Sequence, residues 1–459
     1  MKKYGLPIFL LSLSFLAILS WCIDPDYFWH VKAGEHIFNE GIPFTDIFSW
    51  IGPLHWISHE WLSEIILYIF SWFGNISPFL YIAFFYCLLV FLSYYFNRKS
   101  YEKNLVFSYI WQVIGMLIFT FIMTPRPFLI SNIFLLITVH LLLSYKKSPS
   151  NKIYFLPLIS LIWSNIHGGS SNLPYILTII LLFTNVFDFN YGRIENKKNK
   201  ESITILIWVI VLSIMAICIN PHGFDMVLYP YINMADSFML NTISEWRSPD
   251  IKKIGDIIVF ILIAVNMIVL LIDTKKIKLF DSLLITSFIY LTLRSIRFAP
   301  LLYIVATQIV FDYIKESKQK INYTMNKALL VTGLFIITIT SVNLVNEFGD
   351  KESILSVSDS LIEQIKIINP KKLYNDYDIG GYLIYKDIKV FIDGRADMYS
   401  NYNYKDFYDL TYLEENPNDI IEKYDFDLFI VAKKKPINAY LENAMIKIAE
   451  DDNYAIFER

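Results

Sequence analysis

Long apolar stretches alternate with short polar loops over the first three quarters of the chain. A helix that crosses a bilayer needs about 20 apolar residues without internal charge. About 11 stretches approach this criterion, at 5–23, 78–96, 104–123, 128–145, 153–166, 173–187, 202–219, 257–272, 280–293, 298–312 and 328–345. The pattern predicts a mainly α-helical polytopic membrane protein.

Two other segments are only partly apolar. The run "WISHEWLSEIILYIFSWFG" places His59, Glu60 and Glu64 along one side and bulky apolar residues along the other. This pattern is typical of a helix that lies in the membrane interface. Residues 223–246 are aromatic and interrupted by proline, so we expect a surface element there.

The pattern changes after residue 346, where charges return and apolar runs shorten. "GYLIY", "KVFID", "FDLFIVA" and "YAIFE" are predicted as strands, and "SDSLIEQIKII", "DIIEKY" and "AYLENAMIKIAE" as helices. This alternation is typical of a small α/β domain. We therefore expect a transmembrane domain over 1–346 and an α/β domain over 347–459.

Composition and charge agree with a membrane protein and fix its expected orientation. The chain is 55% hydrophobic and only 18% charged, against about a quarter charged in ordinary soluble domains. Alternate loops, beginning with "MKK" and "NRKSYEK", hold most of the basic residues. Since such loops prefer the cytoplasm, we expect a cytoplasmic N-terminus, a retained first span and an extracytoplasmic C-terminal domain. The net charge of −3 gives no reason to expect nucleic acid.

The unusual polar motifs all fall on the predicted outer side. They are "DPDYFWH", "HWISHEW", "TPRP", "NIHGGSSN", "NPHG", "EWRSP" and "RSIRF". The opposite loops are plain Lys-rich connectors, and the predicted spans carry no charge at their middles. Coupled transporters generally need ionisable groups at that depth, so a site on the outer face is favoured.

Carboxylates and arginines at this face suggest a specific chemistry. A carboxylate can take the proton of an attacking hydroxyl, and guanidinium groups bind phosphate. Asp24 and Asp26 are the candidate bases, while Arg126, Arg294 and Arg297 are candidate ligands of a lipid phosphate. Bland alternatives are solvated charges for the aspartates and, for Arg126, a side chain that snorkels to the interface.

The motifs carry a resemblance to known proteins. A first span, an outer acidic "DPD" and an interfacial helix resemble the GT-C superfamily of membrane glycosyltransferases. "HEWLSE", "TPRP", "NIHGG" and "FIDGRADMY" resemble a family of bacterial multi-span proteins. In GT-C enzymes an acidic residue of this loop is the base, which implies Asp26 or Asp24, with Asp26 favoured. The resemblance also implies a polyprenyl-phosphate-linked sugar donor and a glycan, lipid or protein acceptor.

Other outer residues are candidates for substrate binding. They are His30, His59, Glu60, His167, His222, Arg247, Asp393 and Arg395. Each also has a structural alternative: turn histidines with satisfied hydrogen bonds, an Arg247–Glu245 pair, and a loop network around "FIDGRADMY". Metal binding by His55, His59 or Glu60 is an alternative, since His55 and His59 lie four apart, but the sequence lacks the second histidine of a zincin motif. Because arginines can hold a lipid monophosphate, we predict no metal or other cofactor.

Two other function classes remain open at this point. One is a non-catalytic envelope protein that binds glycans or assists assembly. The other is a transporter of lipid-linked sugars, which predicts a polar path to the inner face. The favoured hypothesis is an inverting glycosyltransferase at the outer surface of the membrane.

Overall fold

A computed structural model describes residues 24–103, 105–120, 123–235, 242, 244–272, 276–316, 357–399 and 402–459. A helix occupies each predicted span inside these ranges, whereas the spans expected at 5–23 and 328–345 lie outside the described residues. The bundle helices are α4 (Ser77–Lys103), α5 (Leu105–Thr120), α6 (Phe128–Lys147), α7 (Phe155–Ile166), α8 (Leu173–Val186), α9 (Lys200–Ile217), α12 (Ile254–Ile272), α13 (Leu279–Arg294) and α14 (Ala299–Glu316).

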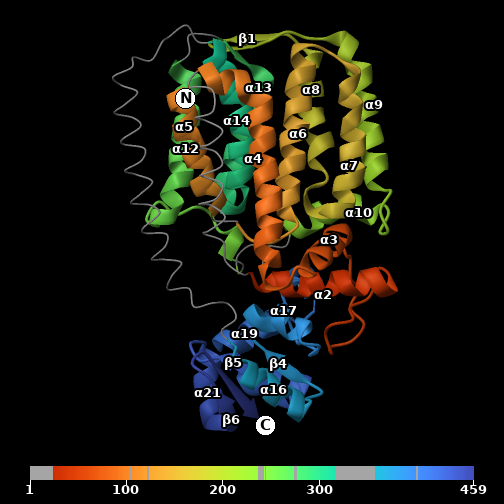
Figure 1. Cartoon of the computed structure of the whole chain (residues 1–459), viewed down its shortest axis with the longest axis vertical. Coiled ribbons are helices and arrows are strands. Elements are labelled where there is room, and N and C mark those ends of the chain that lie inside the picture. The colour runs from red at the N-terminus through yellow and green to blue at the C-terminus, as the bar shows by residue number, and fades with distance from the viewer. Residues whose placement is uncertain are drawn as a thin grey trace.

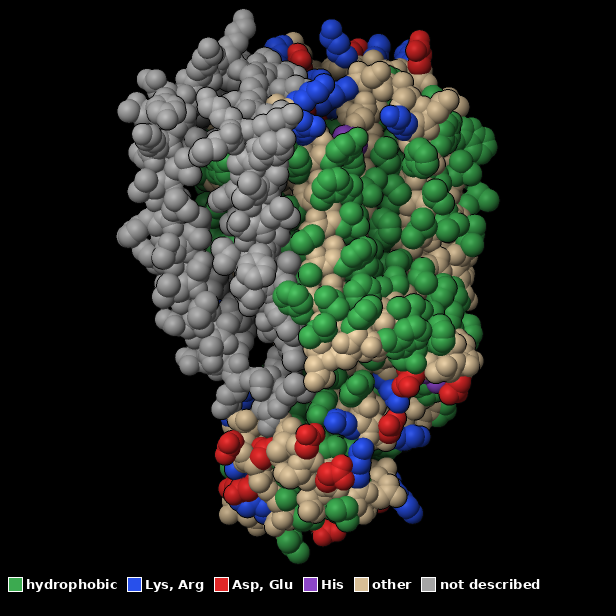
Figure 2. Space-filling model, in the orientation of Figure 1, with side chains coloured by type: hydrophobic (Ala, Val, Ile, Leu, Met, Phe, Trp, Pro, Cys, Tyr) green, Lys and Arg blue, Asp and Glu red, His purple; other side chains and the backbone are tan. Residues whose placement is uncertain are grey.

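Six helical segments of the described chain are long and apolar enough to cross a bilayer. Their burial separates the centre of the bundle from its rim. The segment 296–313 is 72% buried, whereas 200–217 and 254–271 are each 33% buried and present apolar side chains outward. Figure 2 shows the resulting belt of hydrophobic side chains between two charged ends of the molecule. The chain is therefore a multi-span membrane protein.

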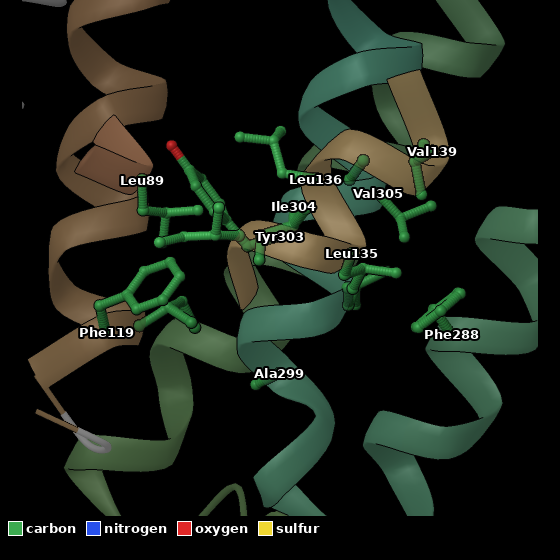
Figure 3. Close-up of a cluster of buried hydrophobic side chains, with 14 of the residues drawn as sticks. Leu89, Phe119, Leu135, Leu136, Val139, Phe288, Ala299, Tyr303, Ile304 and Val305 are labelled. Carbon is green, nitrogen blue, oxygen red and sulfur yellow. The ribbon is translucent and has the colours of Figure 1, made fainter. Parts of the chain in front are cut away.

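The centre of the bundle is filled by large apolar side chains from five helices. Leu89 of α4, Phe119 of α5, Leu135 of α6, Phe288 of α13 and Tyr303 of α14 point toward one another (Figure 3). Apolar side chains removed from water stabilise such a core by about 25 cal/mol per Å² in soluble proteins, but inside a bilayer close packing provides the association between helices.

Two helices close one end of the bundle. α2 (Pro25–Glu40) runs across this end, and α3 (Trp61–Ser71) packs against it (Figure 1). A Cβ on Gly34 would lie 2.0 Å from the carbonyl oxygen of Glu64, so only glycine permits this helix contact. α10 (Asp225–Ala235) borders the same end. We call this the α/β end, because the C-terminal region covers it.

The C-terminal region is an α/β unit docked on α2. Its sheet has the order β4-β5-β7-β6, with β4 and β5 parallel and the other pairs antiparallel. The strands are β4 (Leu373–Asn375), β5 (Leu428–Ala432), β6 (Ile446–Glu450) and β7 (Tyr454–Glu458). The helices are α16 (Asp359–Ile368), α17 (Tyr377–Tyr385), α18 (Ala396–Tyr399), α19 (Tyr404–Tyr412), α20 (Pro417–Tyr424) and α21 (Pro436–Ala444). One apolar core joins this unit to Trp29 of α2 and to Leu54 and Trp56.

Three predicted elements of this region were wrong. "GYLIY" belongs to α17, which Asp376 caps and whose small Gly380 and Gly381 let it pack closely on neighbouring backbone. "AYLENAMIKIAE" is split, because α21 ends at Ala444 and β6 then pairs with β7. "KVFID" forms a single bridge, between Ser49 and Val390, in place of a strand.

A second small sheet lies at the opposite end of the bundle. It consists of β1 (Phe189–Tyr191), β2 (Ile194–Asn196) and β3 (Ile277–Lys278). Figure 1 places β1 at the end farthest from the C-terminus. The Lys-rich turns after α4 and α6 lie at this same end, where Figure 2 shows Lys and Arg gathered.

Candidate functional site

Asp24, Asp26 and Arg126 form one ion-paired centre at the α/β end. Asp24 is the N-cap of α2, and its side chain accepts a hydrogen bond from the backbone N–H of Asp26 (2.9 Å). Arg126 immediately precedes Pro127 and α6; its Nε and Nη2 donate to the two carboxylate oxygens of Asp24 at 2.6 and 2.8 Å. Nη2 also lies 2.9 Å from Asp26 Oδ2. Two predicted site segments, about a hundred residues apart in sequence, thus meet.

The two aspartates differ in their surroundings. Asp24 is 5% exposed and holds Arg126 in a bidentate geometry, so it is buried and paired, not solvated. For Asp26, burial raises the pKa to about 6 against the opposing effect of Arg126. A carboxylate with a pKa near the working pH is suited to accept a proton. Asp26 is therefore the stronger candidate base.

Arg126 and Arg297 converge on one carboxylate, that of Glu245. Glu245 Oε1 lies 3.5 Å from Arg126 Nη2, and Oε2 lies 3.6 Å from Arg297 Nη1. The Arg297 guanidinium also lies 5.0 Å from the ring centroid of Trp246, a cation–π distance. Arg126 first, and Arg297 in addition, lower the pKa of Glu245. The two guanidinium groups thus define a position that favours an anion.

The C-terminal region covers this centre directly. A Cβ on Gly394 would lie 1.7 Å from Asp26 Oδ1, so the "FIDGRADMY" loop touches the candidate base. A Cβ on Gly381 would lie 2.4 Å from the carbonyl oxygen of Pro25. A larger residue at Gly381 would displace the α2 backbone, and one at Gly394 would displace the Asp26 side chain or the loop.

Asp393 and Arg395 belong to an internal network. Arg395 is 2% exposed and donates to both oxygens of Asp393 at 2.8 and 2.7 Å. Its Nη1 donates to Asp46 Oδ1 at 2.7 Å, and its guanidinium lies 4.7 Å from the ring centroid of Trp56. A buried pair needs such complete hydrogen bonding to offset desolvation. The network joins the segment after α2 to the C-terminal region.

A second polar cluster surrounds Glu60, the N-cap residue of α3. Glu60 Oε1 lies 3.3 Å from His167 Nε2 and 3.6 Å from His59 Nε2, while Oε2 lies 3.7 Å from His30 Nε2. His30 Nδ1 lies 3.7 Å from Glu64 Oε1. Gly168 makes this approach possible, because its N–H donates to the carbonyl of His59 and a Cβ there would meet Met226 at 2.2 Å.

His59 and His167 differ in pKa. Burial opposes the charge on His59, but Glu60 outweighs it and raises the pKa of His59 to about 9. For His167, burial lowers the pKa to about 4 despite the same carboxylate. Tyr229 of α10 lies beside His59, with its hydroxyl 3.3 Å from Nε2 and donating to Asp397 at 2.7 Å.

Besides Asp393 and Arg395, three further predicted site residues lie outside both centres. Arg247 pairs with both oxygens of Asp256, and not with Glu245. Arg294 is exposed, and its backbone carbonyl accepts from Ser248. His222 is half-buried and packs against Phe44, with ring centroids 5.3 Å apart.

Sequence reasoning gave no site role to Glu64 and Glu245, which complete the two centres. The signal for Glu64 is its spacing: it follows Glu60 by one helical turn at the start of α3. Glu245 gave no comparable signal, because its partners Arg126 and Arg297 come from distant segments. Only the fold brings these three side chains together.

Comparison with known proteins identifies the fold. No protein-family model and no curated protein matches the chain. Among solved structures, it is similar to the oligosaccharyltransferase of Archaeoglobus fulgidus, crystallised with a tethered acceptor peptide that contains the NVT sequon. The TM-score is 0.57 with 11% identity, over 94% of this chain and 69% of that one. The chain is thus a mainly helical membrane protein with a C-terminal α/β region, and its fold is similar to that of this oligosaccharyltransferase.

Proposed function

We propose that this protein is an inverting membrane glycosyltransferase. It transfers a sugar from a polyprenyl-phosphate donor to an envelope glycan, lipid or protein acceptor. The observation that carries the proposal is Asp26, a carboxylate with a pKa of about 6 held 2.9 Å from Arg126. This pair lies at the α/β end of a GT-C-like bundle, where a membrane-bound donor can meet a water-borne acceptor.

The reaction requires one proton acceptor and one anion site. The acceptor hydroxyl oxygen attacks the anomeric carbon of the donor sugar, and Asp26 takes the hydroxyl proton. The bond from that carbon to the phosphate oxygen breaks, and polyprenyl phosphate leaves with the electron pair. Since attack comes from the face opposite the leaving group, the anomeric configuration inverts.

Arg126 and Arg297 are the proposed ligands of the departing phosphate. Both already contact the Glu245 carboxylate, at 3.5 and 3.6 Å. These separations exceed those of charge-assisted hydrogen bonds, about 2.7–2.9 Å, so the contacts of Glu245 with the two guanidinium groups are weak. A phosphate that takes the place of Glu245 gains the stronger contacts, while Asp24 keeps Arg126 oriented.

The basic residues at one end of the bundle support the proposed orientation of the protein in the membrane. Lys146 and Lys147 end α6, and Lys103 ends α4, all away from the α/β end. Because basic loops prefer the cytoplasm, the α/β end and residues 347–459 are proposed to face outward, with 1–346 as the transmembrane domain. The proposed active site then opens to the extracytoplasmic surface.

Envelope glycan analysis in the native host tests this function. Three strains are compared, with the wild-type gene, a deletion and Asp26→Asn expressed at the wild-type level. The proposal expects a glycan modification that is lost equally in the deletion and in Asp26→Asn. A modification lost in the deletion and retained in Asp26→Asn would overturn catalysis and favour a binding or assembly role.

A further inference from the structure

Three possible metal ligands lie close together in the Glu60 cluster. His59 Nε2, Glu60 Oε1 and His167 Nε2 lie within 4.8 Å of one another, with the carboxylate oxygen 3.6 and 3.3 Å from the two nitrogens. Zinc-type cations bind nitrogen and oxygen at about 2.0–2.2 Å, so ligands at a tetrahedral angle lie about 3.4 Å apart. The separations of Glu60 Oε1 from the two nitrogens therefore match those of ligands around one cation.

The other ring nitrogens of both histidines already have partners. His59 Nδ1 lies 3.3 Å from the carbonyl oxygen of Ile57. His167 Nδ1 lies 2.7 Å from Ser131 Oγ, which accepts a hydrogen bond from Trp163 Nε1 at 2.9 Å. Histidines that bind metals almost always donate their second N–H to such an oxygen, which fixes the ring and directs the free nitrogen to the ion.

A buried polar atom without a partner lies at the far side of the cluster. His30 is 2% exposed, and its Nδ1 has no hydrogen-bond partner among the described residues. This nitrogen faces Glu64 Oε1 at 3.7 Å, and Nε2 faces the second oxygen of Glu60 at 3.7 Å. His30, Glu60 and Glu64 also have ligand atoms within 4.8 Å of one another. The unsatisfied nitrogen is a second sign that a group belongs in this cluster.

We propose that His59 Nε2, Glu60 Oε1 and His167 Nε2 bind one divalent transition-metal ion. Two imidazoles and one carboxylate suit Zn²⁺, Co²⁺, Mn²⁺ or Fe²⁺, whereas Mg²⁺ and Ca²⁺ prefer all-oxygen sites. Three protein ligands leave a coordination position open for water or substrate. The assignment differs from the sequence-based expectation of no metal, and it does not depend on the transferase activity.

The alternative explanation of the same contacts is an ion pair. A protonated His59 would then lie between Glu60 and the Tyr229 hydroxyl, with His167 neutral beside them. Both explanations place charges in a buried site, but only the metal site binds a transition ion with defined stoichiometry. Direct metal binding therefore separates them.

The test uses the purified full-length protein, made with an affinity tag that contains no histidine. After treatment with a chelator, Co²⁺ is titrated and followed by its visible absorption, with bound metal counted by elemental analysis. The variants are Glu60→Gln and His167→Gln, which preserve side-chain volume approximately. The matched control is His55→Ala, because His55 is exposed and lies in the same segment but outside the cluster.

The proposal expects about one equivalent of Co²⁺ in the wild type and His55→Ala, and binding at least about tenfold weaker in the two ligand variants. Thermal unfolding of each chelated protein verifies that the variants are folded, and Co²⁺ should raise the unfolding temperature only where it binds. Equal binding in the wild type and the folded ligand variants, or no binding in any of them, overturns the proposal.

Discussion

At the scale of single residues, Asp24 and Asp26 differ in their contacts and in their proposed roles. Asp24 is buried, caps α2 and holds Arg126 through two hydrogen bonds. Asp26 shares the same guanidinium through a single close contact and has a raised pKa. The proposed proton acceptor Asp26 and its proposed positioning partner Asp24 therefore lie two residues apart at the start of α2.

The pKa of Asp26 gives a pH dependence. Below a pKa of about 6 the carboxyl is protonated and cannot accept the hydroxyl proton, so the transfer rate should fall about tenfold per pH unit below that value and level off above it. The charged and titratable groups around Asp26 are Asp24, His30, Arg126, Glu245 and Tyr377. The measurement is the initial rate of polyprenyl phosphate release between pH 4.5 and 8, a range set roughly around this pKa.

The control for this profile is the stability of the protein over the same pH range. Asp26→Glu should retain some activity with a similar acidic limb, because the carboxylate is kept. A rate that is flat through pH 6 while the protein stays folded would contradict the role of Asp26.

Part of the site was predictable from residue types alone. Asp24, Asp26, Arg126 and Arg297 were candidates because carboxylates and arginines are unusual at a membrane surface. Their pairing was not predictable, because Arg126 reaches Asp24 only through the packing of α2 and α6. In the tail, Arg395 was considered for substrate binding, but its donors face buried protein groups, which a sequence cannot reveal.

At the scale of elements, the crossing of α2 and α3 positions both centres. α2 carries Asp26 and His30, and α3 begins after Glu60 and carries Glu64. The two helices approach so closely that Gly34 of α2 lies against the Glu64 backbone. A change in this contact should therefore disturb the acid–arginine centre and the Glu60 cluster together.

Gly34→Ala tests this dependence. The added Cβ would lie 2.0 Å from the carbonyl oxygen of Glu64, so α2 and α3 must separate. We expect a loss of stability of about 1–3 kcal/mol, the usual cost of overpacking, measured as a lower unfolding temperature in detergent. Asn39→Ala is the control, because Asn39 is exposed near the end of the same helix. Equal unfolding temperatures for both variants would contradict the close α2–α3 contact.

Helices were predictable where the apolar runs were long, and were missed where a short helix is buried on most sides. Long apolar runs such as 128–145 and 257–272 correspond to α6 and α12. The prediction of a strand at "GYLIY" is wrong, because a short helix that is buried at its glycines has the same apolar composition as a strand. α2 was not predicted, since its aromatic, mixed sequence lacks a clear apolar stripe and its burial comes from α3 and the docked C-terminal region.

At the scale of the whole molecule, the α/β region is integrated with the membrane bundle. Its apolar core includes Trp29, Leu54 and Trp56, and its loop at Gly394 touches Asp26. The proposed domain boundary near residue 346 therefore separates two parts that share one site.

The proposed orientation can be tested by cysteine labelling in intact cells. Cys22, Cys87 and Cys218 are first replaced by alanine, and single cysteines are then introduced at the exposed positions Asp452 and Lys197. A membrane-impermeant maleimide should label Asp452→Cys before permeabilisation and Lys197→Cys only afterwards. Asp452 lies between β6 and β7 and Lys197 between β2 and α9, and these elements lie at opposite ends of the molecule. The cysteine-free protein is the control, and the reverse labelling pattern would contradict the proposed orientation.

Asp26 is the proposed general base in sugar transfer from a polyprenyl-phosphate donor. The most direct measurement is the rate at which purified protein releases polyprenyl phosphate from donor lipids extracted from the native host, in the presence of host envelope acceptors. We predict that the wild type releases polyprenyl phosphate and that folded Asp26→Asn releases it about 10²–10⁴-fold more slowly, the usual contribution of a general base. Equal release by both proteins, or none by the wild type with these native substrates, would contradict this role.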